Sequence, residues 1–376
     1  TYPLFHWGPI PWGFYLVLSA AFGFMLHVRK RTRQKYSEAC RPVLGNKVDG
    51  LAGKLIDLIA VFALLAGTAT TFSLATPLLA GAISSVTGIP QSTGLTLVIL
   101  VIVCAIYTFS VYFGMKGVQL SAATCTWLFF GLLAYVFFFG GQTRFIIEEG
   151  ITALGNLTQN FIGLATWTDS LRTSSFPQTW TIFYWAYWMV WCVAVPFFIG
   201  SISKGRTLRQ VILGGYVFGL SGTFTSFIIM GNYGLGLQMH GKLDVLSTYA
   251  ADGNLYHAIL DILGQLPLSK AVLVLLVLCM ITFYSTSFDS ITMVASTYTY
   301  KELKSDEEPH RNVKLFWAIF LILLPLALIF SENSMTNLQT VSIIAAFPVG
   351  IIMLLIISSF FKDADAYLKE QANPPE

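Results

Sequence analysis

Nine apolar stretches follow one another along the 376-residue chain, and each is long enough to cross the hydrocarbon core of a membrane as a helix. Lipid offers the backbone no hydrogen-bond partner, so only helices or closed barrels cross it, and a helical crossing needs about 20 apolar residues. The charged fraction of 11% is less than half of the roughly 25% found in soluble domains. The sequence therefore predicts an all-α polytopic membrane protein, with crossings at residues 11–28, 55–79, 94–114, 120–140, 180–199, 211–237, 270–293, 315–330 and 340–361.

Basic residues are distributed unevenly over the loops between these stretches. Eighteen of the 22 lysines and arginines fall on one side, which identifies that side as cytoplasmic. We therefore expect residue 1 outside and the C-terminus inside. The net charge of +3 is small, which excludes nucleic acid as a partner and leaves membrane lipid. The chain begins with Thr1 and shows no signal peptide, so we expect that an upstream part of the natural protein is missing.

Six large aromatic rings other than phenylalanine stand in the apolar run 180–191. Four of them fall at i, i+3, i+4 and i+7 and share one helix face, namely Tyr184, Tyr187, Trp188 and Trp191. Ring faces in a dry site attract a cation that cannot donate hydrogen bonds, such as a quaternary ammonium. The same spacing is consistent with an interfacial aromatic belt and bulky helix packing. Both interpretations stay open on spacing alone.

Two crossings contain clustered polar side chains, which are costly inside a membrane. Residues 282–290 place hydroxyls and one carboxylate in the inner half of the seventh crossing, among them Thr286 and Ser287. Such oxygens suit a small cation such as sodium. Bonding of the hydroxyls to their own helix backbone is the more common role, and the residues alone favour it. In the second crossing, the small and hydroxylated residues 67–73 favour close helix packing.

The sequence shows no arrangement of residues typical of a catalytic or metal site. The five histidines lie far apart, the five cysteines have no metal-ligand spacing, and no glycine-rich phosphate loop precedes a helix. We therefore expect no enzyme activity and no cofactor, with sodium as a coupling ion at most.

Two further segments are too polar to cross a membrane. Residues 241–269 predict an external loop with short helices. Residues 145–164 predict an amphipathic helix on the membrane surface or at a subunit contact. Its apolar face is expected from the near-helical spacing of Ile147, Ile151, Leu154 and Phe161.

Four segments carry motifs that can be compared with known families. Residues 180–188 read W-T-I-F-Y-W-A-Y-W and residues 201–207 read S-I-S-K-G-R-T. This pair resembles the signature of the betaine/carnitine/choline transporter family, W-T-x-F-Y-W-A-W-W with a later R-I-S-R-G-R-T, and the pairing is very specific. Residues 5–12 and 74–78 resemble the carnitine-type branch, and residues 301–309 resemble the loop after the family's tenth helix. The similarity runs over the whole chain.

The resemblance implies a LeuT-like fold of two inverted five-helix repeats, with substrate held near the membrane midplane. The family has twelve helices, and this chain would supply about nine of them, the fourth to the twelfth. We expect one transmembrane transporter domain over residues 1–376. Its parts would be a partial first repeat (1–144), an external amphipathic helix and loop (145–176), a second repeat (177–361) and a cytoplasmic tail (362–376). The helix at 145–164 is similar to the family's trimer contact, which implies a homotrimer.

By position, the resemblance places the family's aromatic substrate box on Tyr187, Trp188 and Trp191, with Tyr187 in place of the usual tryptophan. Outer or accessory contacts along the pathway would be Trp7, Trp12 and Trp180, and Tyr184 joins the candidates through its shared helix face. Because Tyr187 keeps an aromatic ring, we expect cation–π binding to survive the substitution.

The resemblance also bears on the coupling ion. Thr286 and Ser287 match the hydroxyl pair that binds sodium in sodium-coupled members. In the sodium-independent carnitine branch that pair is lost, and a methionine and an arginine stand in for sodium. The corresponding positions here look like Val195 and Cys125, so both substitutes are missing while the hydroxyls are kept. This favours sodium coupling.

We therefore expect secondary active transport of a quaternary-ammonium compound such as glycine betaine, carnitine or a related betaine, by sodium symport. The alternative is sodium-independent exchange of carnitine-type and butyrobetaine-type substrates. A membrane-embedded enzyme would need a clustered acid, base or metal near the aromatic rings, and the sequence offers none.

Overall fold

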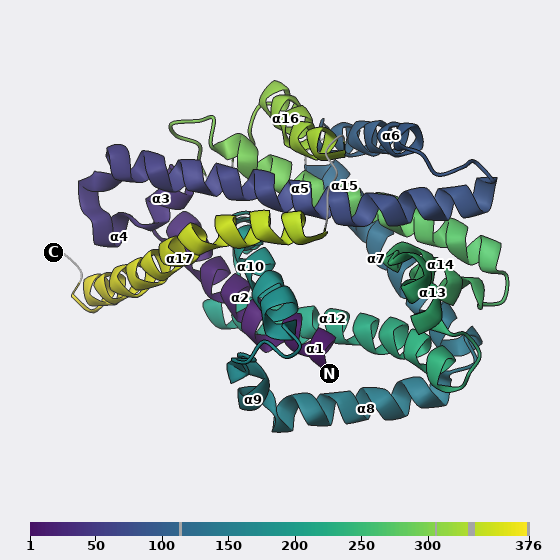
Figure 1. Cartoon of the computed structure of the whole chain (residues 1–376). Helices are drawn as coiled ribbons and strands as arrows, with labels where there is room; N and C mark the ends of the chain where they lie inside the picture. The colour runs from purple at the N-terminus through teal and green to yellow at the C-terminus, as the bar shows by residue number, and fades with distance from the viewer. Residues whose placement is uncertain (113–114, 305–306, 330–334, 374–376) are drawn as a thin grey trace.

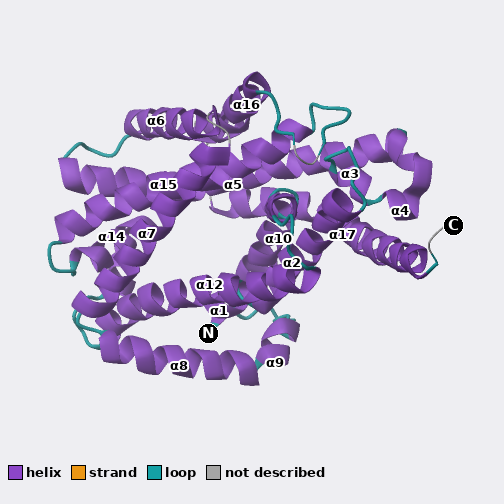
Figure 2. Ribbon diagram, turned by 180° about the vertical axis from the view of Figure 1, so that it is seen from behind, coloured by secondary structure: helices purple, strands orange, loops and turns teal. Residues whose placement is uncertain are grey.

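The computed structural model describes residues 1–112, 115–304, 307–329 and 335–373, and within these ranges the chain is helical with no strand (Figures 1 and 2). Seven helices of the described chain are long and apolar enough to cross a membrane, and a bent helix pair makes an eighth candidate. The seven are Tyr2–Val28 (α1, α2 and η1), α5 (Leu51–Thr87), α6 (Thr93–Tyr112), α7 (Met115–Phe139), α12 (Leu208–Met239), α15 (Ser269–Thr297) and α17 (Met335–Ala372). The all-helical membrane architecture predicted from the sequence is confirmed.

The bent pair coincides with the predicted fifth crossing and contains η3 (Pro177–Thr181), α10 (Ile182–Trp191) and α11 (Val195–Ile202). The predicted run 315–330 falls on α16 (Arg311–Ile329). The predicted ends at 114 and 330, and the last three residues of the predicted tail, lie outside the described residues. Residues 362–372, predicted as a tail, continue α17 without a break.

The remaining elements are short and lie between the long helices. The first crossing candidate is made of α1 (Tyr2–His6), α2 (Pro9–Gly23) and the π-helical turn η1 (Phe24–Val28), and the short elements between it and α5 are α3 (Tyr36–Ala39), α4 (Arg41–Leu44) and η2 (Gly45–Asp49). After α7 they are α8 (Thr143–Gln159), α9 (Phe161–Thr166), α13 (Val245–Asp252) and α14 (Leu255–Gly264). The short helices predicted within residues 241–269 are therefore present.

The long helix α5 runs along the upper half of the view in Figure 1, with α6 and α16 above it and α12 and α8 below. It packs against α15, α16 and α17, and α2 packs against α11 and α12. Helix α10 contacts α2, α5 and α17, so it lies in the interior. Stacked rings hold α5 to α15, because the Phe72 centroid lies 4.2 Å from that of Phe288 and 5.0 Å from that of Tyr284.

The bend between α10 and α11 follows from a proline. The two helix axes meet at 43°, and Pro196 stands in the first turn of α11. Proline has no backbone N–H to donate to the carbonyl four residues earlier, which belongs to Cys192. The fully buried Tyr36 hydroxyl donates to that carbonyl instead, at 3.4 Å. The break is therefore supported from the segment before α5.

Two contacts fix the start of the aromatic helix. The carboxylate of Asp169 accepts hydrogen bonds from the backbone N–H groups of Thr173, Ser174 and Ser175. These bonds, led by the one from Ser174, hold the pKa of Asp169 well below its usual range. At η3, the imidazole Nε2 of His6 lies 2.9 Å from the hydroxyl of Thr181. Together they anchor the loop before α10 and tie it to α1.

The segment 145–164 is helical as predicted, with α8 ending at Gln159 and α9 beginning at Phe161. Helix α8 buries Ile146, Gly150, Ala153 and Leu157, whereas Ile147 and Ile151 remain 47% and 67% exposed. The reason is close packing on α12, where a β-carbon on Gly150 would lie 2.6 Å from Ile228 Cγ2. Small residues make this contact with α12, and it leaves Ile147 and Ile151 of the predicted apolar face on the outside of the chain.

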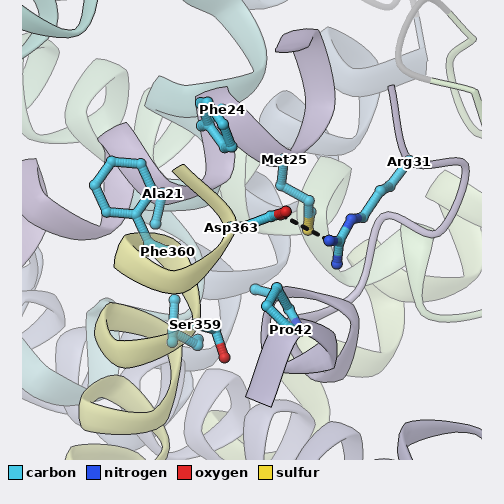
Figure 3. Close-up of a pocket in the computed structure, with 10 residues that line it drawn as sticks. Ala21, Phe24, Met25, Arg31, Pro42, Ser359, Phe360 and Asp363 are labelled. Atoms are coloured by element: carbon cyan, nitrogen blue, oxygen red, sulfur yellow. Dashed lines mark hydrogen bonds and ion pairs between the residues drawn. The ribbon is translucent and has the colours of Figure 1, made fainter. Parts of the chain in front are cut away.

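Ion pairs join the segment after η1 to the end of α17. Asp363 accepts from Arg29 Nε at 2.9 Å and from Arg31 Nη2 at 2.7 Å. Figure 3 shows Arg31 and Asp363 facing each other beside a small pocket that Phe24, Met25 and Phe360 also line. The side chain of Asp363 is only 12% exposed, so these bonds are protected from much of the solvent screening that weakens surface pairs.

We expect Asp363→Ala to lower the free energy of unfolding by about 2 kcal/mol, because two guanidinium groups lose a charged acceptor. The measurement is the thermal unfolding midpoint of the purified protein in mild detergent. Asp365→Ala is the matched control on the same helix, since the Asp365–Lys369 pair is largely exposed and its loss should change nothing measurable. Equal midpoints for the two variants would contradict the anchoring role of Asp363.

Candidate functional site

A cavity of about 310 Å³ lies in the interior beside α10. Its wall is built from five parts of the chain that are far apart in sequence. These are the end of α1 with α2 (Trp7, Tyr15), α5 (Thr71), α10 (Tyr187, Trp188, Trp191), α11 (Val195, Phe198) and α15 (Thr286, Ser287, Ser290). Six of the nine candidate residues predicted from the sequence therefore line one cavity.

Aromatic rings form one wall of this cavity. The centroid of Trp188 lies 4.5 Å from that of Tyr15 and 5.2 Å from that of Trp7, and the Trp7 ring meets Trp188 edge to face. Tyr187 and Trp191 also meet edge to face, with centroids 6.2 Å apart. These contacts fix the orientation of the rings, so the wall is preformed. The aromatic-belt interpretation does not describe these residues, because their rings face an internal cavity.

Three predicted residues do not line the cavity. Trp12 packs on α12, where a β-carbon on Gly219 would lie 2.6 Å from its ring, and it meets Trp188 edge to face with centroids 5.6 Å apart. Tyr184 stacks between His6 and Trp180, with centroid distances of 5.2 and 5.9 Å. Trp12 and Tyr184 each contact a ring that does line the cavity, and Trp180 adjoins Tyr184.

Helix α10 reaches the cavity because α5 carries a glycine opposite it. A β-carbon on Gly67 would lie 3.0 Å from Val190 Cγ1 and 3.3 Å from Trp191 Cε2. Both contacts are tighter than ordinary packing, so an alanine would require Val190 and Trp191 to move by a few tenths of an ångström. The packing role predicted for residues 67–73 is confirmed at this position.

The same stretch of α5 also supplies a polar group that sequence reasoning assigned only to packing. Thr71 Oγ1 lies 2.9 Å from the Gly67 carbonyl and 2.5 Å from the hydroxyl of Tyr187. The pair lies at the junction of the aromatic wall and α5, and both residues line the cavity. The signal that could have identified Thr71 was its place one turn beyond Gly67 on the helix face that meets α10.

Hydroxyl groups of α15 also line the cavity. Thr286 Oγ1 donates to the Thr282 carbonyl at 2.9 Å, and Ser290 Oγ donates to the Thr286 carbonyl at 3.2 Å. The expected bonding of hydroxyls to their own helix is therefore confirmed for these two. Ser287 is exposed to the cavity and has no hydrogen-bond partner among the described residues. Its hydroxyl is open to a ligand or an ion.

The carboxylate of the same stretch faces elsewhere. Asp289 is fully buried, and its Oδ2 accepts from Ser110 Oγ of α6 at 2.7 Å. It does not line the cavity. Over the described part of the chain, no group of three or more His, Cys, Asp or Glu side chains could hold a metal ion. Any ion at the cavity would be held by hydroxyl and carbonyl oxygens.

Phe198 separates this cavity from a second one of about 200 Å³, because it lines both. The second cavity is bounded by Phe197 and Met293 and by the acidic side chains Glu307 and Glu308. One phenylalanine ring is therefore the partition between the aromatic site and a more polar space. Single apolar residues such as Phe198 and Tyr15 carry no sequence pattern, and their roles become visible only in three dimensions.

Comparison with known proteins places this geometry in a family. The profile of the betaine/carnitine/choline family transporters matches residues 1–369. The chain belongs to the betaine/carnitine/choline transporter family. It is therefore a multi-pass membrane protein of a transporter family, as the sequence motifs predict.

Two curated relatives align over almost the whole chain. A protein of Acinetobacter baumannii named carnitine transporter is 29% identical over 357 residues, which cover 94% of this chain and 64% of the relative. An Escherichia coli K12 protein named uncharacterized transporter YeaV is 27% identical over 362 residues, covering 96% of this chain and 75% of the relative. The chain thus spans about two thirds to three quarters of the relatives' lengths.

Accessibility of α15 tests the cavity directly. We expect Ser287→Cys to react with a cationic methanethiosulfonate reagent, because the side chain is exposed to the cavity. Ser285→Cys is the matched control, since Ser285 is 3% exposed on the same helix and should stay unlabelled. Labelling is read by mass spectrometry of the protein in detergent. Equal labelling of both variants would show that the cavity wall is not formed by this face of α15.

Proposed function

We propose that this chain carries out secondary active transport of a trimethylammonium compound that also bears a carboxylate, such as glycine betaine or carnitine. The observation that supports this most strongly is the preformed wall of Tyr187, Trp188 and Trp191 beside a cavity of about 310 Å³. The name of the Acinetobacter baumannii relative, carnitine transporter, agrees with this substrate class.

The physical argument concerns what can bind a methylated ammonium. Its nitrogen carries no hydrogen, so it cannot donate hydrogen bonds. It is held best by the electron-rich faces of aromatic rings. Each well-desolvated ring contact contributes up to about 2 kcal/mol. No carboxylate lines the cavity, so within the described residues the rings are the groups suited to hold a methylated ammonium there.

Sodium is the proposed coupling ion. Thr286, Ser287 and Ser290 line the same cavity as the rings, and Ser287 has its full bonding capacity available. Hydroxyl oxygens are hard ligands that suit a small cation. A sodium ion there would lie at the carboxylate end of a substrate whose ammonium lies against the rings. The order would be ammonium, carboxylate, sodium, so that neighbouring charges have opposite signs.

Alternating access would follow from differential binding. Substrate and ion shift the conformational equilibrium only by as much as they bind one state better than another. Phe198 supports a simple route, because movement of one ring would join the substrate cavity to the second cavity lined by Glu307 and Glu308.

We further propose the arrangement in which this transport occurs. The fold would be the LeuT-like inverted repeat, with residues 1–144 and 177–361 in its two halves and the C-terminus of α17 on the cytoplasmic side of a bacterial inner membrane. The exposed Ile147 and Ile151 of α8 support a homotrimer, because an apolar stripe on the outer face of a helix is suited to a subunit contact.

Removing one ring tests the substrate site. Trp188→Leu should abolish the quenching of tryptophan fluorescence by glycine betaine or carnitine and weaken binding at least tenfold, since a cation–π contact worth up to about 2 kcal/mol is lost. Trp127→Leu is the matched control, because Trp127 is 80% exposed on α7, away from the cavity. Binding by Trp188→Leu that equals the wild type would rule out the aromatic wall.

Removing the α15 hydroxyls tests the coupling ion. Thr286→Ala combined with Ser287→Ala should raise the sodium concentration needed for half-maximal uptake into proteoliposomes, because two candidate oxygen ligands are lost. Ser226→Ala on α12, whose hydroxyl also bonds to its own helix, is the control. Uptake by the wild type that proceeds equally well without sodium would point to exchange of internal and external substrate instead.

A further inference from the structure

The pair formed by Thr71 and Tyr187 has a defined direction of hydrogen bonding. Thr71 has one hydroxyl hydrogen, and the Gly67 carbonyl one turn earlier on α5 takes it at 2.9 Å. The 2.5 Å contact between Thr71 Oγ1 and Tyr187 Oη therefore uses the hydrogen of the phenol. This direction places every available hydrogen in a bond and forms a chain from Tyr187 through Thr71 to the Gly67 carbonyl.

The consequence is that this corner of the cavity cannot donate a hydrogen bond without breaking the chain. Thr71 Oγ1 keeps a lone pair after accepting from Tyr187, and the indole N–H of the neighbouring Trp191 is itself directed to the phenol oxygen. Both residues line the cavity and both are partly exposed. The corner is therefore an acceptor at the edge of the aromatic wall.

An acceptor corner selects among trimethylammonium compounds. A carboxylate is also an acceptor, so it gains nothing there and is repelled by the lone pairs. A hydroxyl group can donate its hydrogen. Because the accepting oxygen of Thr71 is bonded to the hydroxyl of Tyr187, whose ring belongs to the cation wall, the ligand hydroxyl must lie only a few bonds from the ammonium.

We propose that Thr71 and Tyr187 make the site selective for trimethylammonium compounds that carry a hydroxyl group near the ammonium, as L-carnitine does, over the corresponding compounds without it. This inference rests on the proposed function and specifies its substrate class. Tyr187 gives the wall its ring and donates its phenol hydrogen to Thr71. A tryptophan at 187 would offer an indole N–H, which is a donor, and would reverse the preference of the corner.

A matched pair of ligands tests this selectivity. L-carnitine and γ-butyrobetaine differ only in one hydroxyl group, so the ratio of their dissociation constants isolates its contribution. In purified protein at fixed sodium concentration, we expect the wild type to bind L-carnitine about fivefold more tightly than γ-butyrobetaine, which corresponds to one neutral hydrogen bond. The readout is quenching of tryptophan fluorescence or titration calorimetry.

The variants assign the preference to the corner. Thr71→Val keeps the shape of the side chain and removes the acceptor. Combined with Tyr187→Phe, it should bring the ratio of the two dissociation constants close to one. Thr71→Ser keeps the hydroxyl and should retain the preference, which keeps the test informative if the double variant is unstable. Thr126→Val, an exposed position on α7 with the same helix-bonded hydroxyl, should change nothing.

The outcomes separate this inference from the proposed function. Equal binding of the two ligands by the wild type would overturn the hydroxyl preference and leave the transport of trimethylammonium compounds standing. A preference that survives in the double variant would also overturn the role of the corner. Failure of the wild type to bind either ligand would overturn the proposed function and this inference together.

Discussion

The close packing of α10 on α5 at Gly67 is the contact on which the site depends. It is possible because the residue on α5 has no side chain, so Val190 and Trp191 can approach the α5 backbone. One turn further along, this proximity brings Thr71 to Tyr187. The bend at Pro196 then directs α11 away from the α10 axis, so that Val195 and Phe198 close the cavity from another direction. The aromatic rings, the hydroxyl of Thr71 and the ring of Phe198 meet at one cavity because α5 and α10 pack closely at Gly67.

The resulting cavity has three chemically different parts. One part consists of rings that suit a cation without hydrogen-bond donors, a second part consists of α15 hydroxyls, and the corner between α5 and α10 accepts hydrogen bonds. A zwitterion with a methylated ammonium at one end and a carboxylate at the other matches this division. In a low-dielectric interior, each mismatch between such groups is more costly than it would be in water.

Much of this could be read from the sequence, because membrane helices and aromatic spacing leave strong patterns. The apolar stretches correspond to helices, and Tyr187, Trp188 and Trp191 share a face that does line a cavity. The sequence could not show that Trp12 packs over Gly219 or that Tyr184 stacks between His6 and Trp180, because both depend on neighbours distant in the chain. Residues 282–290 divide in the same way, since Ser287 faces the cavity while Asp289 faces α6. Which side chains of a buried helix face the cavity is set by the helices that pack around it.

The most direct test of the central claim compares glycine betaine with an analogue of the same shape that lacks the positive charge. In 3,3-dimethylbutyrate a quaternary carbon replaces the nitrogen of glycine betaine, so its size, apolar surface and carboxylate are kept while the positive charge is removed. If the rings of α10 bind the charge, purified protein should bind glycine betaine at least tenfold more tightly than the carbon analogue, because each cation–π contact contributes up to about 2 kcal/mol. Equal affinity for the two ligands would mean that the aromatic wall provides only an apolar surface, and would contradict recognition of a quaternary ammonium.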